Sequence, residues 1–537
     1  TASAFSEVGV AERSRLYYSS ATASQADGVV RGLTSVNFDD RPRLRRLTLG
    51  DTSVSAGPIG GAVVMGGVTF ARDFALDPYL FRHPTMRFTS STELPATIDV
   101  FVDGIRVRSE PIAPGTFTLD HLRGLAGAGR VRYVVRDSLG REQVFARPYY
   151  VSPDVLAKGL DDFAVSAGLP RDAVGRESFS YLDPSFLAYY RRGLSDFLTL
   201  GGRAEGQWGR VSGGPVVATV TPLGALEVET AASVDVNGRA GVAALFAYEY
   251  LSRRFNLATS LRLLSDEYST VSLRPEQDRS LAQATLSTSV PIGERATLAA
   301  QHTVDLHRDA PTYARVGALT QVRLGGDFLL TAQLALVTLE PPASSWDGFL
   351  GVTWSPRSGF FTSAGARTTD GVAGANFQVN RPATVGEDWS MAGAVDVSTV
   401  TRASLQSHLQ TRSATLSAFF DQTPDSSTLA LEPAGSLVWV KDGGFFLSRP
   451  LYDGFALVRV PEVEGVRVYV NAQEVGRTNA AGNVLAPSLI SHFGTHVTIS
   501  PEDVPLDYDL ERDRVIAAPP RRGAAWVEFP ARRVHYF

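Results

Sequence analysis

The chain has 537 residues, which is too long for one hydrophobic core, so it predicts several domains or one very large barrel. A net charge of −5 gives no whole-chain reason to expect a nucleic acid as partner. Cysteine is absent, which excludes disulfides, zinc ribbons and thiol nucleophiles. Forty-nine glycines, many aromatic residues and only 20% charged residues favour an all-β protein over a helical one.

Residues 1–92 contain several β-like segments, which we expect to be the first strands of a barrel. A glycine-rich run, 57–67, lies between two of these segments. Glycine within a strand pattern indicates sharp bends or a close approach of another group to the backbone.

Residues 93–150 predict a compact β-sandwich inserted into the strand series. Two-residue alternation runs through Ile98, Val100 and Val102 and stops at Asp103, which is followed by glycine. Asp-Gly between alternating segments is a strong hairpin signal, because glycine supplies the positive φ of the turn. Such a module between barrel strands is expected to be a plug for the pore.

Residues 151–452 alternate throughout in segments of about nine to eleven residues, the length of a tilted strand that crosses a bilayer. In 226–236 one face carries Leu226, Val228, Thr230, Ala232, Val234 and Val236, and the other carries Glu227, Glu229, Ala231, Ser233 and Asp235. A simple apolar face opposite a charged one predicts a transmembrane antiparallel β-barrel. Stacked soluble β-domains would also alternate and are the competing interpretation. At about 20 residues per strand and turn, roughly fourteen or fifteen strands are expected here, and about four more in 1–92.

Residues 453–537 change to short strands around turns and predict a second β-sandwich, with Val466, Val468 and Val470 on one face. No run of about 18 apolar residues predicts a transmembrane helix.

Catalytic and metal-binding patterns are weak, and we expect neither an enzyme nor a cofactor. The cluster of His302, Asp305 and His307 cannot share a metal, because residues 302 and 307 point to opposite faces of a strand. Glu227 and Glu229 share a face and could act as acid and base, but a hydrated pore wall is by far the favoured interpretation.

Several motifs occur in an order that resembles a known family. They are Leu47-Thr-Leu-Gly-Asp51, Val68-Thr-Phe-Ala-Arg-Asp73, Ala96-Thr-Ile-Asp-Val-Phe-Val-Asp-Gly104, Ile112-Ala-Pro-Gly-Thr-Phe117, Phe455-Ala-Leu-Val458, Gly476-Arg-Thr478 and Val504-Pro-Leu-Asp-Tyr-Asp-Leu510. Together they resemble the outer-membrane ushers of the chaperone–usher pilus pathway. The segment from Asp99 to Gly104, taken with Tyr149 to Pro153, looks closest to the archaic, spore-coat-like branch.

This resemblance implies an outer-membrane pore, 24-stranded in the family, that secretes and polymerises pilus subunits. It implies that the plug closes the resting pore and swings out on activation. The implied partners are periplasmic chaperone–subunit complexes, pilus subunits in the lumen and outer-membrane lipid, without nucleic acid. One subunit's strand replaces the chaperone's strand in its neighbour, an exchange of backbone hydrogen bonds that needs no nucleotide.

The chain departs from the family pattern at both ends, so we expect it to be a fragment. It lacks the N-terminal periplasmic domain of the family and stops before a second C-terminal domain. The residues that contact cargo are expected within 453–537, on the periplasmic side.

Charged residues suggest a latch between plug and wall, although an ordinary hydrated sandwich surface explains them as well. The plug residues are Asp99, Asp103, Arg106, Arg108 and Glu110, and the lumenal residues are Arg203, Glu205 and Asp235. Two other functions stay open: a plugged porin-like channel or transporter, and a soluble adhesin built of repeated β-domains. The C-terminal sandwich argues against a porin, because a porin usually ends with its last barrel strand.

Overall fold

The computed structural model describes most of the chain. Outside the described residues lie 1, 11–15, 20–28, 85, 93–95, 103–104, 113–114, 123–126, 138–141, 153, 175–176, 275, 340–342, 357–358, 384–386, 441–443, 452, 522 and 535–537. The described residues are almost entirely β-strand, with three short 3₁₀-helices: η1 (Arg41–Arg43), η2 (Phe74–Leu76) and η3 (Pro501–Asp503). In these described ranges no helix has the length and apolar character needed to cross a membrane.

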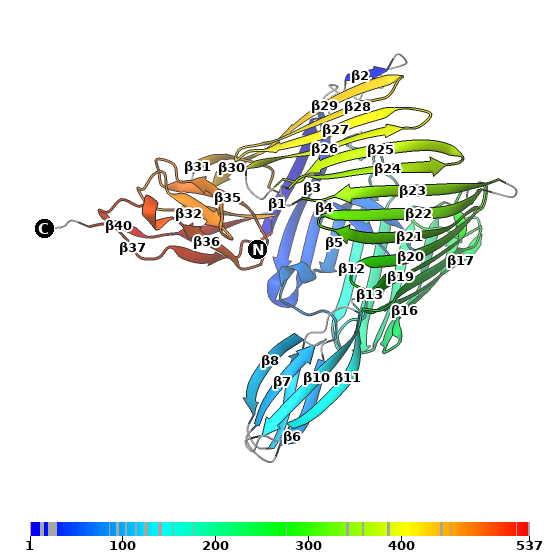
Figure 1. The fold of residues 1–537 in the computed structure, drawn as a ribbon, viewed down its shortest axis with the longest axis horizontal. Helices are drawn as coiled ribbons and strands as arrows, with labels where there is room; N and C mark the ends of the chain where they lie inside the picture. The colour runs from blue at the N-terminus through cyan, green and yellow to red at the C-terminus, as the bar shows by residue number, and fades with distance from the viewer. Residues whose placement is uncertain are drawn as a thin grey trace.

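One antiparallel sheet of 23 strands forms the wall of a wide barrel (Figure 1). Its strands are β1 (Ala2–Val10), β2 (Leu16–Ser19), β3 (Val29–Asp40), β4 (Arg45–Ser55), β5 (Ala62–Arg72), β12 (Asp161–Pro170), β13 (Ser185–Ser195), β14 (Leu198–Gln207), β15 (Arg210–Thr221), β16 (Gly224–Asp235), β17 (Ala240–Leu251), β18 (Asn256–Leu264), β19 (Ser280–Ile292), β20 (Ala296–His307), β21 (Tyr313–Gly325), β22 (Phe328–Leu339), β23 (Ser344–Trp354), β24 (Phe361–Thr369), β25 (Val372–Arg381), β26 (Asp388–Val397), β27 (Arg402–Gln410), β28 (Thr415–Gln422) and β29 (Ser426–Ala434).

Neighbours in sequence are neighbours in the wall from β3 to β5 and from β12 to β29, and β5 pairs with β12, so the intervening residues form an inserted domain. The first strands lie at the two ends of the series, where β1 pairs with β3 and β2 pairs with β29. Only residues 11–15 separate β1 from β2 in the sequence, so the N-terminal segment connects the two ends of the sheet.

The predicted alternation is confirmed. On β16, Glu229 is 2% exposed on the inner face, whereas Val234 is 47% exposed on the outer face. The strand count from the sequence was too low, because β12 to β29 are 18 strands where fourteen or fifteen were expected. Tight turns, such as the two residues between β14 and β15, shorten the repeat to about 15 residues.

The inserted domain comprises β6 (Met86–Thr92), β7 (Ala96–Val102), β8 (Ile105–Ile112), β9 (Gly115–Leu122), β10 (Gly127–Asp137) and β11 (Glu142–Val151). A four-stranded sheet in the order β11-β10-β7-β8 packs with the β6–β9 pair around a core that includes Ile98, Val100 and Tyr133. β7 and β8 pair antiparallel on either side of the expected Asp103-Gly104 turn, which itself lies outside the described residues. In Figure 1 this domain lies outside the ring of strands.

The C-terminal domain follows a short hairpin, β30 (Ser436–Val440) and β31 (Gly444–Ser448). Its strands are β32 (Gly454–Arg459), β33 (Arg467–Val470), β34 (Gln473–Arg477), β35 (Asn483–Leu489), β36 (Thr495–Ile499), β37 (Tyr508–Leu510), β38 (Arg514–Ala517), β39 (Ala524–Glu528) and β40 (Ala531–Arg533). Sheets β35-β32-β39 and β34-β33-β36-β38 enclose a core in which Val466, Val468 and Phe529 are fully buried.

Both accessory domains are attached at the same rim of the barrel. β29 ends there and leads to the C-terminal domain, and antiparallel order places the end of β5 and the start of β12 there as well. We call this edge the C-terminal rim. It also carries the turns between β17 and β18 and between β27 and β28.

Candidate functional site on the inner wall of the barrel

The inner face of β14 carries a buried ion pair. Alternation turns Arg203 and Glu205 inward, where they are 5% and 0% exposed. The Arg203 Nη1 atom lies 2.9 Å from Glu205 Oε1, and Glu229 on β16 lies 3.9 Å from Arg203 Nε. Buried charges require partners, so the groups around this pair must supply hydrogen bonds or opposite charges.

The tip of the β4–β5 hairpin, residues 56–61, folds onto this pair. The Gly61 N–H donates to both Glu205 carboxylate oxygens, at 2.9 and 3.1 Å. Arg203 Nη2 donates to the Ile59 carbonyl at 3.0 Å. Glycine is required at 61 because a Cβ there would lie 2.4 Å from Glu205 Oε2. The glycine-rich run therefore marks a close backbone approach, as the sequence indicated.

A second segment, residues 265–279 between β18 and β19, closes over the same charges. Tyr268 is fully buried, and its hydroxyl donates to the Ile59 carbonyl at 2.8 Å and accepts a hydrogen bond from Arg203. The Val271 N–H approaches Glu205 at 3.3 Å. Glu205 thus ties three separate parts of the chain together on the inner wall.

The predicted lumenal residues divide between two places. Arg203 and Glu205 form the cluster just described, whereas Asp235 lies at the opposite end of the barrel wall from the C-terminal rim. There it pairs with Arg239 at 2.6 Å and accepts from the Asn237 N–H of the β16–β17 turn. The structure does not bring these three residues to one point.

The predicted plug residues pair with one another on the inserted domain. Arg108 and Glu110 form an ion pair of 2.8 Å, and Arg106 lies 3.8 Å from Asp99. Asp103 lies outside the described residues. With the inserted domain outside the ring, Arg203 and Glu205 contact the hairpin tip, residues 265–279, Ser212 and Glu229. The latch stays a prediction for a different domain position.

Sequence reasoning missed Ile59, Tyr268 and Val271. Their backbone and hydroxyl groups complete the cluster. These residues lie outside the strands, where two-residue periodicity does not predict the direction in which a side chain points. The distance in sequence, 144 residues from Gly61 to Glu205, also leaves no local signal.

The two histidines of the cluster point to opposite faces of β20, as their parity predicts. His307 lies 3.5 Å from both Asp305 and Asp278, whereas His302 is on the outer face opposite Leu286 and Val316. In the part of the chain that is described, no group of three or more histidine or acidic side chains could hold a metal ion.

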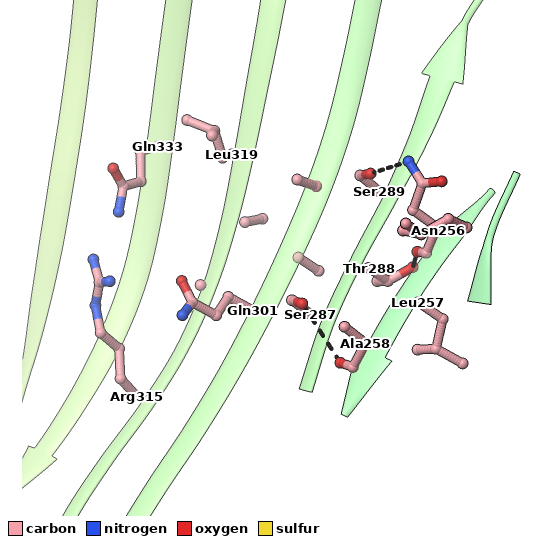
Figure 2. Close-up of a pocket in the computed structure, with 15 residues that line it drawn as sticks. Asn256, Leu257, Ala258, Ser287, Thr288, Ser289, Gln301, Arg315, Leu319 and Gln333 are labelled. Atoms are coloured by element: carbon pink, nitrogen blue, oxygen red, sulfur yellow. Dashed lines mark hydrogen bonds between the residues drawn. The ribbon is translucent and has the colours of Figure 1, made fainter. Parts of the chain in front are cut away.

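A second feature of the inner wall is a hollow that reaches from the end of β17 to β22 and is lined by both polar and small apolar side chains (Figure 2). Ser287, Gln301, Arg315 and Gln333 line it, one from each strand. Small and amide side chains of this kind give a wall that is hydrated and only weakly attractive to a passing protein surface. We regard this hollow as part of the lumen rather than as a separate ligand site.

The inserted domain contacts the C-terminal rim through Tyr150. Its hydroxyl donates to the Glu249 carbonyl at 3.0 Å and accepts from the Leu251 N–H at 3.2 Å, at the β17–β18 turn. Burial raises the pKa of Tyr150, so this hydroxyl keeps its proton and its donor role.

The tether before the inserted domain contacts the C-terminal domain. Tyr79 stacks on Phe493 with ring centroids 5.4 Å apart, and its hydroxyl accepts from the Gly494 N–H at 2.9 Å. The adjacent His492 is buried, and this burial lowers its pKa. One loop of the C-terminal domain thereby touches the segment that positions the inserted domain.

The fold and the inner wall define a class: a large membrane β-barrel with an inserted β-domain and a C-terminal β-sandwich on one rim. Residues 363–529 match the family model described as outer membrane usher protein. Over these residues the chain resembles the outer membrane usher family.

Relatives and solved structures agree with this assignment. The chain is 28% identical to the F1 capsule-anchoring protein of Yersinia pestis over 42% of this chain and 27% of that protein. It is 23% identical to the outer membrane usher protein LpfC of Salmonella typhimurium over 93% of this chain and 61% of that protein. The chain therefore spans less than two thirds of the length of these relatives.

A solved structure shares the fold. It is the cryo-EM structure of an E. coli P pilus tip assembly intermediate, PapC-PapD-PapK-PapG, matched with a TM-score of 0.70 and 14% identity. The match covers 100% of this chain and 67% of that chain.

Proposed function

We propose that the full-length protein is an outer-membrane usher that assembles and secretes pilus or fimbrial subunits delivered by a periplasmic chaperone. The observation that carries this proposal is a barrel with two accessory β-domains on one rim, in a chain that matches the usher family. The names of relatives, among them an outer membrane usher and a capsule-anchoring protein, support it.

The surfaces of the barrel suit passage of a folded protein. The outer face is apolar, with exposed residues such as Leu334 and Leu350, as contact with lipid requires. The inner face is polar, and a ring of more than twenty strands encloses a wide aqueous channel. The C-terminal rim then faces the periplasm, where subunits arrive.

Assembly by strand exchange needs no catalytic group and no ATP, because one backbone ladder replaces another. We therefore propose a non-enzymatic role without a cofactor. Cargo contacts are expected on residues 453–537, where the sheet edges β34 and β38 lie.

Gating is proposed for the inserted domain. Its position beside the rim corresponds to an open pore, and its two tethers, at 73–85 and 152–160, let it return to the lumen. In that closed position the charged residues from Asp99 to Glu110 would face the inner wall. Charge reversal at Arg106 and Arg108 should then raise ion conductance of the full-length pore in planar bilayers, and unchanged conductance would count against the latch.

The second candidate, a plugged porin-like channel, is favoured only by the inserted domain. A single experiment separates the two: purified full-length protein is mixed with a chaperone–subunit complex and, as control, with the chaperone alone. Retention of the complex but not of the chaperone supports the usher. Equal retention of the complex and of the chaperone alone, together with solute flux through the reconstituted pore, would favour the channel.

A further inference from the structure

The hairpin that joins the barrel to the C-terminal domain has an unusual surface. One residue, Gly435, separates β29 from β30, and β30 pairs antiparallel with β31. The pairing Leu437 with Leu447 and Trp439 with Phe445 places four large apolar side chains on one face. We call this set, Leu437, Trp439, Phe445 and Leu447, the hairpin face.

The hairpin face is bare, whereas the opposite face is covered. Its four side chains are between 65% and 72% exposed, but Val438 on the other side is 9% exposed. Backbone contacts hold the hairpin at the C-terminal rim: the Leu451 N–H donates to Ser436 Oγ at 3.1 Å, and the Arg449 N–H donates to the Arg412 carbonyl at 3.1 Å. An apolar face of this kind marks an interaction site.

The occupant follows from continuity with the lipid-facing surface. Leu429 and Leu431 face outward on β29 and are 48% and 59% exposed. In the sequence the two-residue period continues from these residues through Pro433 and Gly435 to Leu437 and Trp439. β30 and β31 form a separate sheet beyond Gly435, so the continuity of the hairpin face with the outer face of β29 is part of the proposal.

The same rim carries outward aromatic side chains on other strands, as the interface girdle of a membrane barrel does. They are Phe255, Phe328, Trp354 and Trp389, each between 38% and 45% exposed. Trp439 and Phe445 add to this girdle beyond β29. Tryptophan with leucine is the composition expected where headgroups meet acyl chains.

We propose that the hairpin face is a membrane-interface anchor, which inserts into the headgroup and acyl boundary of the leaflet on the side of the C-terminal rim. This rests on the proposed outer-membrane location. The anchor fixes the direction in which the chain leaves the barrel and so orients the C-terminal domain relative to the membrane plane.

Residues 1–537 contain no cysteine, so one introduced cysteine labels a single site in them. Any cysteine elsewhere in the full-length protein is replaced by serine. Single-cysteine variants Leu437→Cys and Phe445→Cys of the full-length protein are labelled with an environment-sensitive fluorophore and reconstituted into phosphatidylethanolamine and phosphatidylglycerol vesicles. Doxyl-labelled lipid quenches from within the bilayer, and iodide quenches from water. Leu431→Cys on the barrel wall is the lipid control, and Leu506→Cys, at a side chain 93% exposed on the C-terminal domain, is the water control.

The anchor predicts lipid quenching at 437 and 445 of about half or more of that at 431, with weak iodide quenching. Iodide quenching at 437 and 445 equal to that at 506, with 431 still quenched by lipid, would overturn the anchor and leave the barrel intact. Absence of lipid quenching at 431 would instead refute the membrane location itself. Protection from both quenchers with excimer formation between pyrene labels would show a second copy on the hairpin face and reject the lipid assignment.

Discussion

Removal of the Glu205 carboxylate should release the β4–β5 hairpin tip from the inner wall. Glu205→Ala deletes the acceptor of the Gly61 N–H and leaves the buried Arg203 with a more distant carboxylate, that of Glu229 at 3.9 Å. A hydrogen bond to a charged group contributes about 1.5–3 kcal/mol. Loss of the Gly61 bond alone should therefore raise local opening of 56–61 roughly tenfold to a hundredfold.

Hydrogen exchange measured by mass spectrometry on the purified protein in detergent reports this opening directly. Peptides that cover 56–62 and 269–273 should exchange faster, while β14 itself stays protected by its ladder bonds. Glu227→Ala is the matched control, because Glu227 shares the inner face of β16 and, within the described residues, no hydrogen bond or ion pair joins it to the hairpin tip. Unchanged exchange in both segments would refute the view that Glu205 anchors them.

A steric variant tests the same contact from the other side. Gly61→Ala places a methyl group 2.4 Å from Glu205 Oε2, so it should produce the same faster exchange at 56–62. Gly202→Ala on the same strand as Glu205 is the control, since its nearest atom would be 3.4 Å away. Equal exchange in the two variants would contradict the close approach.

Three further outcomes are expected. Tyr79→Ala removes the stack on Phe493, worth about 0.5–1.5 kcal/mol, and should speed exchange in 490–495, whereas Tyr79→Phe should keep most of the protection. The hydrogen bond from Arg467 lowers the pKa of Asp503; this stabilisation is therefore full above the unfolded pKa near 4 and is lost as pH falls through the folded pKa. Denaturation of the C-terminal domain against pH should show this acid loss, and Asp503→Asn should abolish it. Phe529→Ala should destabilise that domain by about 3–5 kcal/mol in chemical denaturation, and a shift below 1 kcal/mol would contradict its burial.

Most of the fold could be predicted from the two-residue periodicity of the sequence. Strands in contact with lipid on one side and water on the other alternate strictly, so the facing of Leu226 and Glu227 could be predicted from their parity alone. The strand number could not, because it depends on turn lengths that hydrophobic alternation does not record. A two-residue turn and a five-residue turn leave the same pattern in the flanking strands.

The site was predictable only in part. Arg203 and Glu205 face inward, and several of their partners are backbone groups, those of Ile59, Gly61 and Val271. Any residue carries a backbone N–H and C=O, so residue type gives no sign of such contacts. Only glycine leaves a trace, since the close approach at residue 61 excludes a side chain.

The stack of Tyr79 on Phe493 also limits how far the inserted domain can travel. An extended chain spans at most about 3.3–3.6 Å per residue. From Asp73 to the start of β6 the connecting segment could reach roughly 45 Å, but with Tyr79 held in place only the part after residue 79 is free, roughly 24 Å. The contact with the C-terminal domain therefore restricts this segment to about half of its reach, and release of the one aromatic ring would nearly double it.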